Sequence, residues 1–488
     1  MATQDTPSTT GTTSTTSTTS TTSTTSTTAH LSPEALADAL APLAAALGDR
    51  LLTPAADAFA DTAALFVGGP PRTPAAVARV RTADEVATVL AVARDAGLPL
   101  AVRSGGHHQA RHALVDGGLV LDLRLMDGVE IDTAAGVGRA QGGVLAGAYT
   151  AAAGAQGLAT GFGDTATVGV GGISLGGGIG YLSRRDGLTV DNLLGAEVVL
   201  ADGKVVQADA DNNPDLYWAL RGGGGNFGVV TRLDLRLREV GTVTGGMMMW
   251  EPTPERLATV LRAFAEGPEE FSGMVNVMLA PPVPMIPAEL HGKPVLMALL
   301  CHSGAAEDAA EVFGPLRALG PLLDGVQQIP YTALFEGPGG PPAGGVGDVR
   351  TGFLGQGAWA PDEDWAAAAI EAVSGASGPS AVNIRPMGGA ISRVDPAATA
   401  FAHRDPAFMV SVGGTAMAPD ALPATSAWVA SAAEALGVRG RGYVNFMGTA
   451  TEQDVRNAYP EATLARLREV KRAYDPGNLF ASNHNVRP

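Results

Sequence analysis

The stretch from Thr167 to Gly180 contains seven glycines in fourteen residues. Glycine is a poor helix former, so this stretch is not expected to form a stable isolated helix. A backbone without Cβ atoms can approach a bulky ligand closely and offer its N–H groups to phosphate oxygens. The stretch therefore predicts a ligand-binding surface made of backbone, around which the rest of the chain must fold.

A second glycine turn lies earlier, in the sequence Arg103-Ser-Gly-Gly-His107. The apolar run from Leu98 to Val102 predicts a short buried strand, and the two glycines after it allow a sharp turn. Such a turn presents His107 at a strand end, where the imidazole is available for chemistry or lies beside a phosphate-bearing cofactor. Taken alone, the turn leaves an incidental surface histidine as an open alternative.

Charge and cysteine content exclude several classes of partner. The net charge of -17 argues against binding nucleic acid or an anionic membrane surface. A single cysteine, Cys301, excludes a disulfide framework and a cysteine-based metal site, and we predict no metal ligands. The sequence has neither a membrane-spanning apolar run nor a signal-peptide pattern, so we expect a cytoplasmic protein without a membrane partner. The oligomeric state is left open.

The composition divides the chain into four parts of an α+β protein. Residues 1–30 form a Thr/Ser-rich tail that is expected to be disordered. Strands, helices and glycine-rich turns alternate over residues 31–240, and strands alternate with longer helices over 241–440. Residues 441–488 form a separate C-terminal segment that is apolar enough at its end to dock on the body.

Local signals in the first half of the chain predict several elements. Ser32, before Pro33, and Thr82 are predicted to cap helices that run toward Gly48 and through Ala96. Asp202-Gly203 predicts the turn of a hairpin, and the alternating residues of Val229 to Leu237 predict a strand.

Two further local patterns make specific predictions about strands. The alternation over Leu119 to Leu125, followed by Asp127-Gly128 and the run Val129 to Ile131, predicts a hairpin. The segment Gly442 to Phe446 predicts a strand that carries Tyr443 and Asn445 on one face.

Three short motifs suggest other functions. The glycine pattern at 223–228 follows a helix and precedes a strand, the reverse of a dinucleotide fingerprint, and is rejected. Gly172-Ile-Ser-Leu-Gly176 fits the pattern of a serine-hydrolase elbow, but glycines replace the helix that should follow the serine, so a hydrolase stays a distant alternative. His403-Arg404-Asp405 fits either a catalytic cluster or, more simply, a polar cap on the next strand.

The set of motifs resembles the FAD-linked oxidoreductases of the vanillyl-alcohol oxidase/p-cresol methylhydroxylase (PCMH) fold, and within it the berberine-bridge-enzyme-like branch. The resemblance rests on Arg103 to His107, the Leu119 to Met126 strand, Gly169 to Gly180, Asp191-Asn-Leu193, Trp218 to Gly222, Asn226 to Val230, Tyr474 to Asn478, and Asn483 to Pro488. It implies a two-part PCMH-type FAD-binding domain over 31–240, an α/β substrate domain with an antiparallel sheet over 241–440, and a berberine-bridge-like segment over 441–488 that returns to the FAD domain.

The resemblance also implies which residues hold FAD. His107 corresponds to the histidine that bonds covalently to the flavin 8α-methyl group. Many relatives carry a second link through a cysteine, but Thr165 stands near that position here, so at most one link is expected. Further contacts to FAD are implied for Arg103, Ser104, Gly105, Gly106, Thr167, Val168, Gly169, Gly171, Gly172, Gly176, Gly177, Gly228, Val230, Asn483 and Asn485.

The function implied by the resemblance is that of an oxidase. A small alcohol, sugar or amine would pass a hydride to flavin N5, and O2 would reoxidise the flavin to give hydrogen peroxide. Tyr443 is the first candidate to accept an alcohol proton, Asn445 and Tyr181 are second, and packing of Tyr443 under the flavin is an equal alternative. A dehydrogenase or an oxidative cyclase of secondary metabolism with another acceptor, and a non-catalytic flavin- or carbohydrate-binding protein, are the competing functions.

Overall fold

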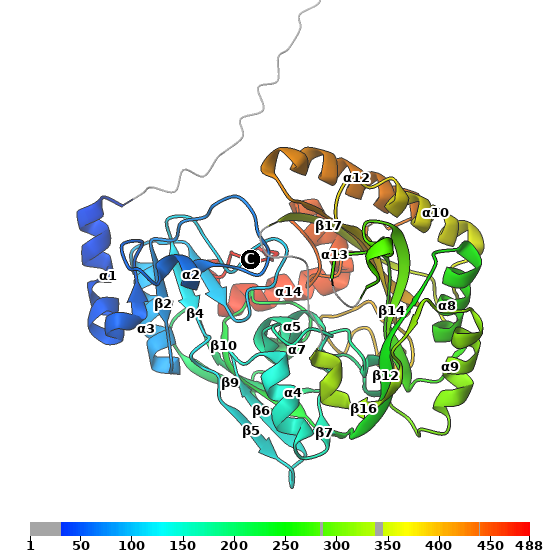
Figure 1. Cartoon of the computed structure of the whole chain (residues 1–488). Coiled ribbons are helices and arrows are strands. Elements are labelled where there is room, and N and C mark those ends of the chain that lie inside the picture. Colours follow the sequence, from blue (N-terminus) through cyan, green and yellow to red (C-terminus); the bar gives the residue numbers. More distant parts are fainter. Residues whose placement is uncertain (1–30, 284–285, 337–344, 439) are drawn as a thin grey trace, which may run out of the picture.

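The structure is a computed structural model, and it describes residues 31–283, 286–336, 345–438 and 440–488. The predicted Thr/Ser-rich tail lies outside the described residues. Three main sheets with their helices, and one small two-stranded sheet, make up the fold (Figure 1). None of the helices in these ranges combines the length and apolar character needed to cross a bilayer.

The first sheet has four short strands in the order β1-β2-β4-β3. Its strands and helices are β1 (Leu51–Leu52), β2 (Ala76–Arg79), β3 (Leu100–Arg103), β4 (Leu119–Asp122), α1 (Pro33–Leu47), α2 (Phe59–Ala63) and α3 (Ala83–Asp95). Ser32 and Thr82 cap α1 and α3 by accepting a backbone N–H, as their positions predict. The sheet ends at Arg103, so β3 leads directly into the Gly-Gly-His turn.

The predicted hairpin between Leu119 and Ile131 is wrong. β4 lies between β2 and β3 and runs parallel to both, whereas β5 (Val129–Asp132) pairs with β6 (Val137–Gln141) in the second sheet. All four residues of β4 are buried, including Asp122, whose carboxylate pairs with Arg124. The alternation of leucines suggested a half-exposed strand, but both faces of this central strand are covered.

The second sheet has five antiparallel strands in the order β5-β6-β10-β8-β9. It contains β8 (Leu193–Val199), β9 (Val205–Asp209) and β10 (Val229–Arg236), and its helices are α4 (Ala146–Gly154), α5 (Val170–Gly176), α6 (Ser183–Asp186) and α7 (Pro214–Leu220). β7 (Leu158–Ala159) and β11 (Arg238–Glu239) form a small separate pair. The predicted pairing of the strands around Asp202-Gly203 is confirmed by β8 and β9.

Part of the glycine-rich run forms the helix α5 within the folded protein. Val170 and Leu175 are buried in the core of the second sheet, so tertiary packing stabilises a helix that propensity does not favour. Ser174 lies inside this helix and is fully buried. Since a nucleophile elbow requires an exposed serine on a strand-to-helix turn, this placement removes support for a hydrolase.

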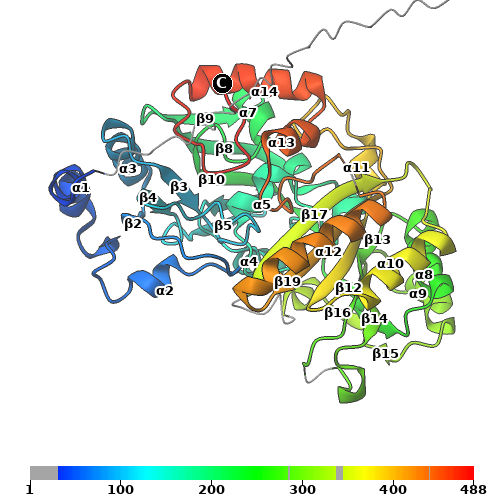
Figure 2. The same ribbon diagram turned by 90° about the horizontal axis from the view of Figure 1, so that it is seen from above.

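The third sheet has eight strands and is antiparallel (Figure 2). Its main order is β15-β12-β14-β13-β18-β19-β17, with β16 also paired to β12. The strands are β12 (Thr242–Trp250), β13 (Phe271–Leu279), β14 (Pro294–His302), β15 (Leu323–Asp324), β16 (Gln327–Pro330), β17 (Val346–Leu354), β18 (Ser380–Pro386) and β19 (Phe408–Ala416). The outer face is covered by α8 (Pro254–Glu266), α9 (Ala309–Ala318), α10 (Glu363–Ser374) and α12 (Leu422–Ala435), and the short α11 (Ala390–Arg393) contacts α6 (Figure 1).

The C-terminal segment packs against the first half of the chain. Helices α13 (Glu452–Ala458) and α14 (Glu461–Tyr474) bury Leu467 in the same core as Trp218 and Phe227. The fully buried ammonium of Lys471 donates to the Asp475 carboxylate at 2.6 Å and to the carbonyl of Asn226 at 2.8 Å. The tail that follows is therefore fixed against the glycine-rich turn before β10.

The predicted strand at 442–446 is wrong. The amides of Phe446 and Met447 both donate to the carbonyl of Tyr443, at 2.8 and 2.9 Å, which makes this segment a turn. The amide of Tyr443 donates to the hydroxyl of Thr351 on β17 rather than to a strand partner. With its hydrogen bonds satisfied locally and by one side chain, the segment needs no sheet.

Candidate active site

The two glycine-rich stretches contact each other directly. A Cβ atom on Gly105 would lie 2.2 Å from the amide nitrogen of Gly169, and a Cβ on Gly169 would lie 2.2 Å from the hydroxyl of Ser104. The Ser104 hydroxyl donates to the carbonyl of Gly142 at 2.8 Å, and Gly171 lies against the same carbonyl. Close approach of the protein's own chain is therefore one reason for glycine at these positions.

Gly172 differs from its neighbours in this respect. It is exposed although α5 is otherwise mostly buried, and no atom of the described residues lies within 4 Å of the position that its Cβ would take. By contrast, Gly176 lies against the side chain of Asn445, and Gly177 against the ring of Tyr443. The open surface of α5 is thus at Gly172, where a ligand can reach the backbone.

His107 follows the turn and stacks on Phe66, with ring centroids 4.0 Å apart. Burial lowers the pKa of His107 to about 4, although the carbonyl of Thr167 acts in the opposite direction. The imidazole is therefore neutral at pH 7 and keeps a nitrogen lone pair. A neutral, positioned imidazole beside the contact of the two glycine-rich stretches fits the role that the resemblance implies.

The side chain of Arg103 contacts the segment before β2. Its guanidinium donates to the carbonyls of Thr62 and Ala64, the latter at 2.6 Å, and anchors the segment before β2. Burial and the neighbouring charge of Arg124 lower the pKa of Arg103 to about 10. The guanidinium of Arg103 is thus engaged with the protein's own backbone.

The other residues predicted to contact FAD lie on several parts of the chain. The carbonyl of Val168 accepts a hydrogen bond from the amide of Ala146, and the carbonyl of Val230 lies 2.3 Å from the position of a Cβ on Gly142. Gly228 lies against Val198 at the start of β10. In the tail, the Asn483 side-chain amide donates to the carbonyl of Gly225 at 3.1 Å. The Oδ1 atoms of Asn483 and Asn485 are buried, and no described residue donates a hydrogen bond to them.

The structure brings Tyr443 and Asn445 together but separates Tyr181 from them. The buried Tyr443 hydroxyl accepts hydrogen bonds from the amide of Gly178 at 2.8 Å and from the Asn445 side chain at 3.0 Å. Burial raises the pKa of Tyr443 despite these bonds. Tyr181 lies in another apolar cluster, next to Phe335, where burial also raises its pKa.

This arrangement makes Tyr443 a poor proton acceptor. A hydroxyl has two acceptor lone pairs, and both are engaged here. Asn445 also donates to the carbonyl of Ile173 in α5 at 3.0 Å. Tyr443 and Asn445 therefore fix the 443–446 turn to the glycine-rich run.

A polar network that no sequence motif predicts lies between the third sheet and the first half of the chain. Arg385 on β18 forms a largely buried ion pair with Asp164, which also accepts from the Thr165 hydroxyl at 2.8 Å. Arg385 donates to Asn383 at 3.0 Å, and Asn383 donates to Asn276 on β13 at 2.8 Å. No sequence signal marks this pair, because its members are 221 residues apart and follow no motif.

His403-Arg404-Asp405 has a structural role rather than a catalytic one. Arg404 is almost fully buried and makes two hydrogen bonds to the carboxylate of Asp191, at 2.7 and 2.8 Å. His403 lies 2.8 Å from the carbonyl of Ala458 through Nε2. Both side chains join the segment before β19 to other parts of the chain.

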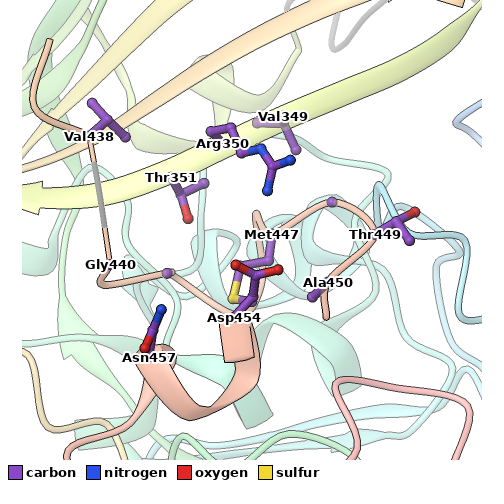
Figure 3. Close-up of a pocket in the computed structure, with 12 residues that line it drawn as sticks. Val349, Arg350, Thr351, Val438, Gly440, Met447, Thr449, Ala450, Asp454 and Asn457 are labelled. Atoms are coloured by element: carbon purple, nitrogen blue, oxygen red, sulfur yellow. The ribbon is translucent and has the colours of Figure 1, made fainter. Parts of the chain in front are cut away.

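A separate small cavity of about 180 Å³ lies between β17, the 440–450 segment and α13 (Figure 3). Arg350, Asp454 and Met447 line it, and no predicted FAD contact does. Ligand pockets typically measure about 300–1,000 Å³, so we assign no ligand to this cavity.

Comparison with known proteins agrees with this geometry. A family model described as FAD binding domain matches residues 74–209, and one described as berberine and berberine like matches residues 442–487. The (R)-6-hydroxynicotine oxidase of Paenarthrobacter nicotinovorans is 31% identical over 432 residues, which cover 85% of this chain and 91% of that protein.

Solved structures agree as well. The crystal structure of 6-hydroxy-D-nicotine oxidase from Arthrobacter nicotinovorans is 30% identical, covers 90% of this chain and 97% of its own, and has a TM-score of 0.79. Xylooligosaccharide oxidase from Myceliophthora thermophila is 26% identical, and the match covers 93% of this chain and 98% of that one, with a TM-score of 0.79. These matches confirm the predicted α+β, PCMH-type architecture and the predicted resemblance. The chain belongs to the berberine-bridge-enzyme-like family of FAD-dependent oxidoreductases.

Proposed function

We propose that this protein is an oxidase that takes a hydride from a small alcohol, sugar or amine and passes the electrons to O2, giving hydrogen peroxide. FAD, when bound, supplies the hydride acceptor at flavin N5. The observation that most supports the proposal is the neutral imidazole of His107 beside two contacting glycine-rich stretches. The open backbone at Gly172 and the unpartnered Oδ1 atoms of Asn483 and Asn485 fit a bulky polar cofactor.

We further propose that His107 holds FAD covalently through the 8α carbon. Burial keeps the imidazole neutral, so a lone pair is free for nucleophilic attack near neutral pH. Phe66 restricts the ring by stacking on it. A structural neighbour that is 23% identical, the glucooligosaccharide oxidase from Acremonium strictum, carries a 6-S-cysteinyl, 8α-N1-histidyl FAD. Here the only cysteine, Cys301, is buried in another cluster, so one link is expected.

The substrate would meet the inner face of the third sheet. Arg385, Asn383 and Asn276 form a hydrogen-bonded row there that can orient a polar substrate group. The hydroxyl of Tyr443 already accepts two hydrogen bonds. This favours a substrate whose oxidation does not require a tyrosine to remove a proton. A neutral amine meets this condition, and the relative that oxidises 6-hydroxynicotine supports an amine as the first class to test.

The proposal is tested by mixing the purified protein with a panel of amines, alcohols and sugars without oxygen. A substrate should bleach the visible flavin absorbance, and air should restore it with formation of one hydrogen peroxide per reduction. Fast reoxidation by an artificial acceptor but not by air would instead indicate a dehydrogenase. Purification without any flavin would contradict the assignment of FAD.

A further inference from the structure

Three histidines from two distant parts of the chain form a cluster beside the turn that carries His107. His108 and His112 follow that turn, and His484 belongs to the C-terminal tail. Their ring centroids are 4.6 to 5.0 Å apart in each pair. One nitrogen from each ring can be chosen so that all three lie within 4.8 Å of one another.

The hydrogen bonds of the cluster leave nitrogens without partners. Nε2 of His108 lies 2.8 Å from the carbonyl of Val444 and therefore carries the proton, which leaves Nδ1 as an acceptor. The amide of Ala110 is 3.1 Å from that Nδ1. Nε2 of His112 and Nε2 of His484 are buried and have no hydrogen-bond partner in the part of the chain that the structure describes. A buried polar atom without a partner is unusual in a folded protein and requires an explanation.

A metal ion explains this arrangement. Metal-ligating histidines commonly donate their second ring N–H to a backbone carbonyl, as His108 does to Val444. A histidine ligand binds a metal through a ring nitrogen that carries no proton, and Nε2 of His112 and Nε2 of His484 have no hydrogen-bond partner among the described residues.

We propose that His108, His112 and His484 bind one divalent transition-metal ion, with Zn²⁺ as the first candidate. Imidazole nitrogen is a preferred ligand of Zn²⁺, whereas Mg²⁺ prefers oxygen. Zn–N bonds of about 2.0–2.1 Å require the three rings to rotate toward a common point, and the weak contact from the Ala110 amide gives way. Three protein ligands leave a fourth position for water.

The bound ion would fasten the C-terminal tail to the turn that carries His107. The Ser482 hydroxyl already donates to the carbonyl of His112 at 2.9 Å, so the tail lies in place for the third ligand. An ion at this point would connect residues 372 positions apart in sequence, His112 and His484. The inference is independent of the oxidase reaction, because no hydride or proton step uses the cluster.

The test uses untagged protein that is stripped with EDTA, equilibrated with Zn²⁺ and freed of unbound metal by gel filtration. Elemental analysis should find one zinc per chain, and a tenfold excess of Mg²⁺ should not displace it. His112→Gln and His484→Gln should each weaken binding at least tenfold. His291→Gln is the matched control, because its Nε2 is engaged with the carbonyl of Ile286 at 2.9 Å, and it should bind zinc as the wild type does.

A second readout covers the case in which a variant folds poorly. Zn²⁺ should raise the melting temperature of the wild type and of His291→Gln, but not that of His484→Gln, and EDTA should reverse the rise. Absence of stoichiometric zinc from the wild type, or equal retention by the cluster variants, would overturn the proposal. Flavin absorbance measured on the same samples separates this result from any failure of the oxidase assignment.

Discussion

The backbone of Gly105 lies against the backbone of Gly169, with only 2.2 Å between the amide nitrogen of Gly169 and the position of a Cβ on Gly105. This contact joins the turn after β3 to the start of α5, and thus joins the first sheet to the second. It also sets where His107 lies relative to the open backbone of Gly172. The contact therefore positions the main elements of the proposed FAD site.

We predict that Gly169→Ala disrupts this site. The new methyl group would lie 2.2 Å from the Ser104 hydroxyl and 2.3 Å from the Gly105 amide nitrogen, so the backbones must separate. Such overpacking costs about 1–3 kcal/mol of unfolding free energy, and we expect a lower flavin-to-protein absorbance ratio. Gly314 lies on the exposed side of α9, and a Cβ there would have no atom of the described residues within 4 Å. Gly314→Ala should therefore lower neither the unfolding free energy nor the flavin-to-protein absorbance ratio.

We predict that Tyr443→Phe lowers the free energy of unfolding by more than it raises the activation free energy of flavin reduction. The change leaves the Gly178 amide and the Asn445 side chain without their acceptor, which costs about 1–3 kcal/mol. Tyr331→Phe is the control, because the buried Tyr331 hydroxyl has no partner among the described residues, and its loss should be neutral. A general base contributes about 10²–10⁴-fold to rate, so a fall of that size with unchanged stability would make Tyr443 the base after all.

We predict strong coupling between Arg385 and Asp164. Breaking a buried ion pair costs about 3–5 kcal/mol, so Arg385→Gln and Asp164→Asn should each be strongly destabilising. The double variant should lose less stability than the sum of the two, as denaturant unfolding would measure. Arg393→Gln breaks an exposed pair with Glu269 and should cost no more than about 1 kcal/mol. Additive losses for Arg385 and Asp164 would contradict the coupling.

We predict that His403 makes stability fall as the pH drops below about 6.5, the ordinary pKa of histidine. Burial lowers the pKa of His403 in the folded protein, so the unfolded chain binds a proton first. The contribution of neutral His403 to the unfolding free energy is present above pH 6.5 and is lost as the pH falls toward the lowered pKa. In His403→Gln the unfolding free energy should depend less steeply on pH in that window, by up to one proton. An unchanged slope would show that His403 does not titrate in this way.

The sequence predicted elements whose signals are local. The capping residues Ser32 and Thr82, the Asp202-Gly203 turn and the alternating residues of β10 all led to elements that the structure contains. Errors arose where tertiary packing decided the outcome. β4 is buried on both faces by neighbours that its own alternation does not reveal, and α5 is stabilised by the core around Val170.

The site was predictable where it lies on contiguous motifs, and not where it depends on distant contacts. The turn at His107 and the run from Gly169 could be recognised from their glycines, although much of their need for glycine comes from contact with protein rather than from a ligand. The Arg385–Asp164 pair and the approach of His484 to His112 join segments hundreds of residues apart. No periodicity or spacing rule relates such residues.

The most direct test of the account is acid precipitation of the purified protein beside its His107→Ala variant. If FAD is bound through His107, the wild-type pellet stays yellow and its flavin remains with the peptide that contains this residue, whereas the variant releases all of its flavin. Release of free FAD by the wild type would contradict the covalent role of His107. A wild-type protein that contains no flavin at all would contradict the proposed FAD-dependent oxidase.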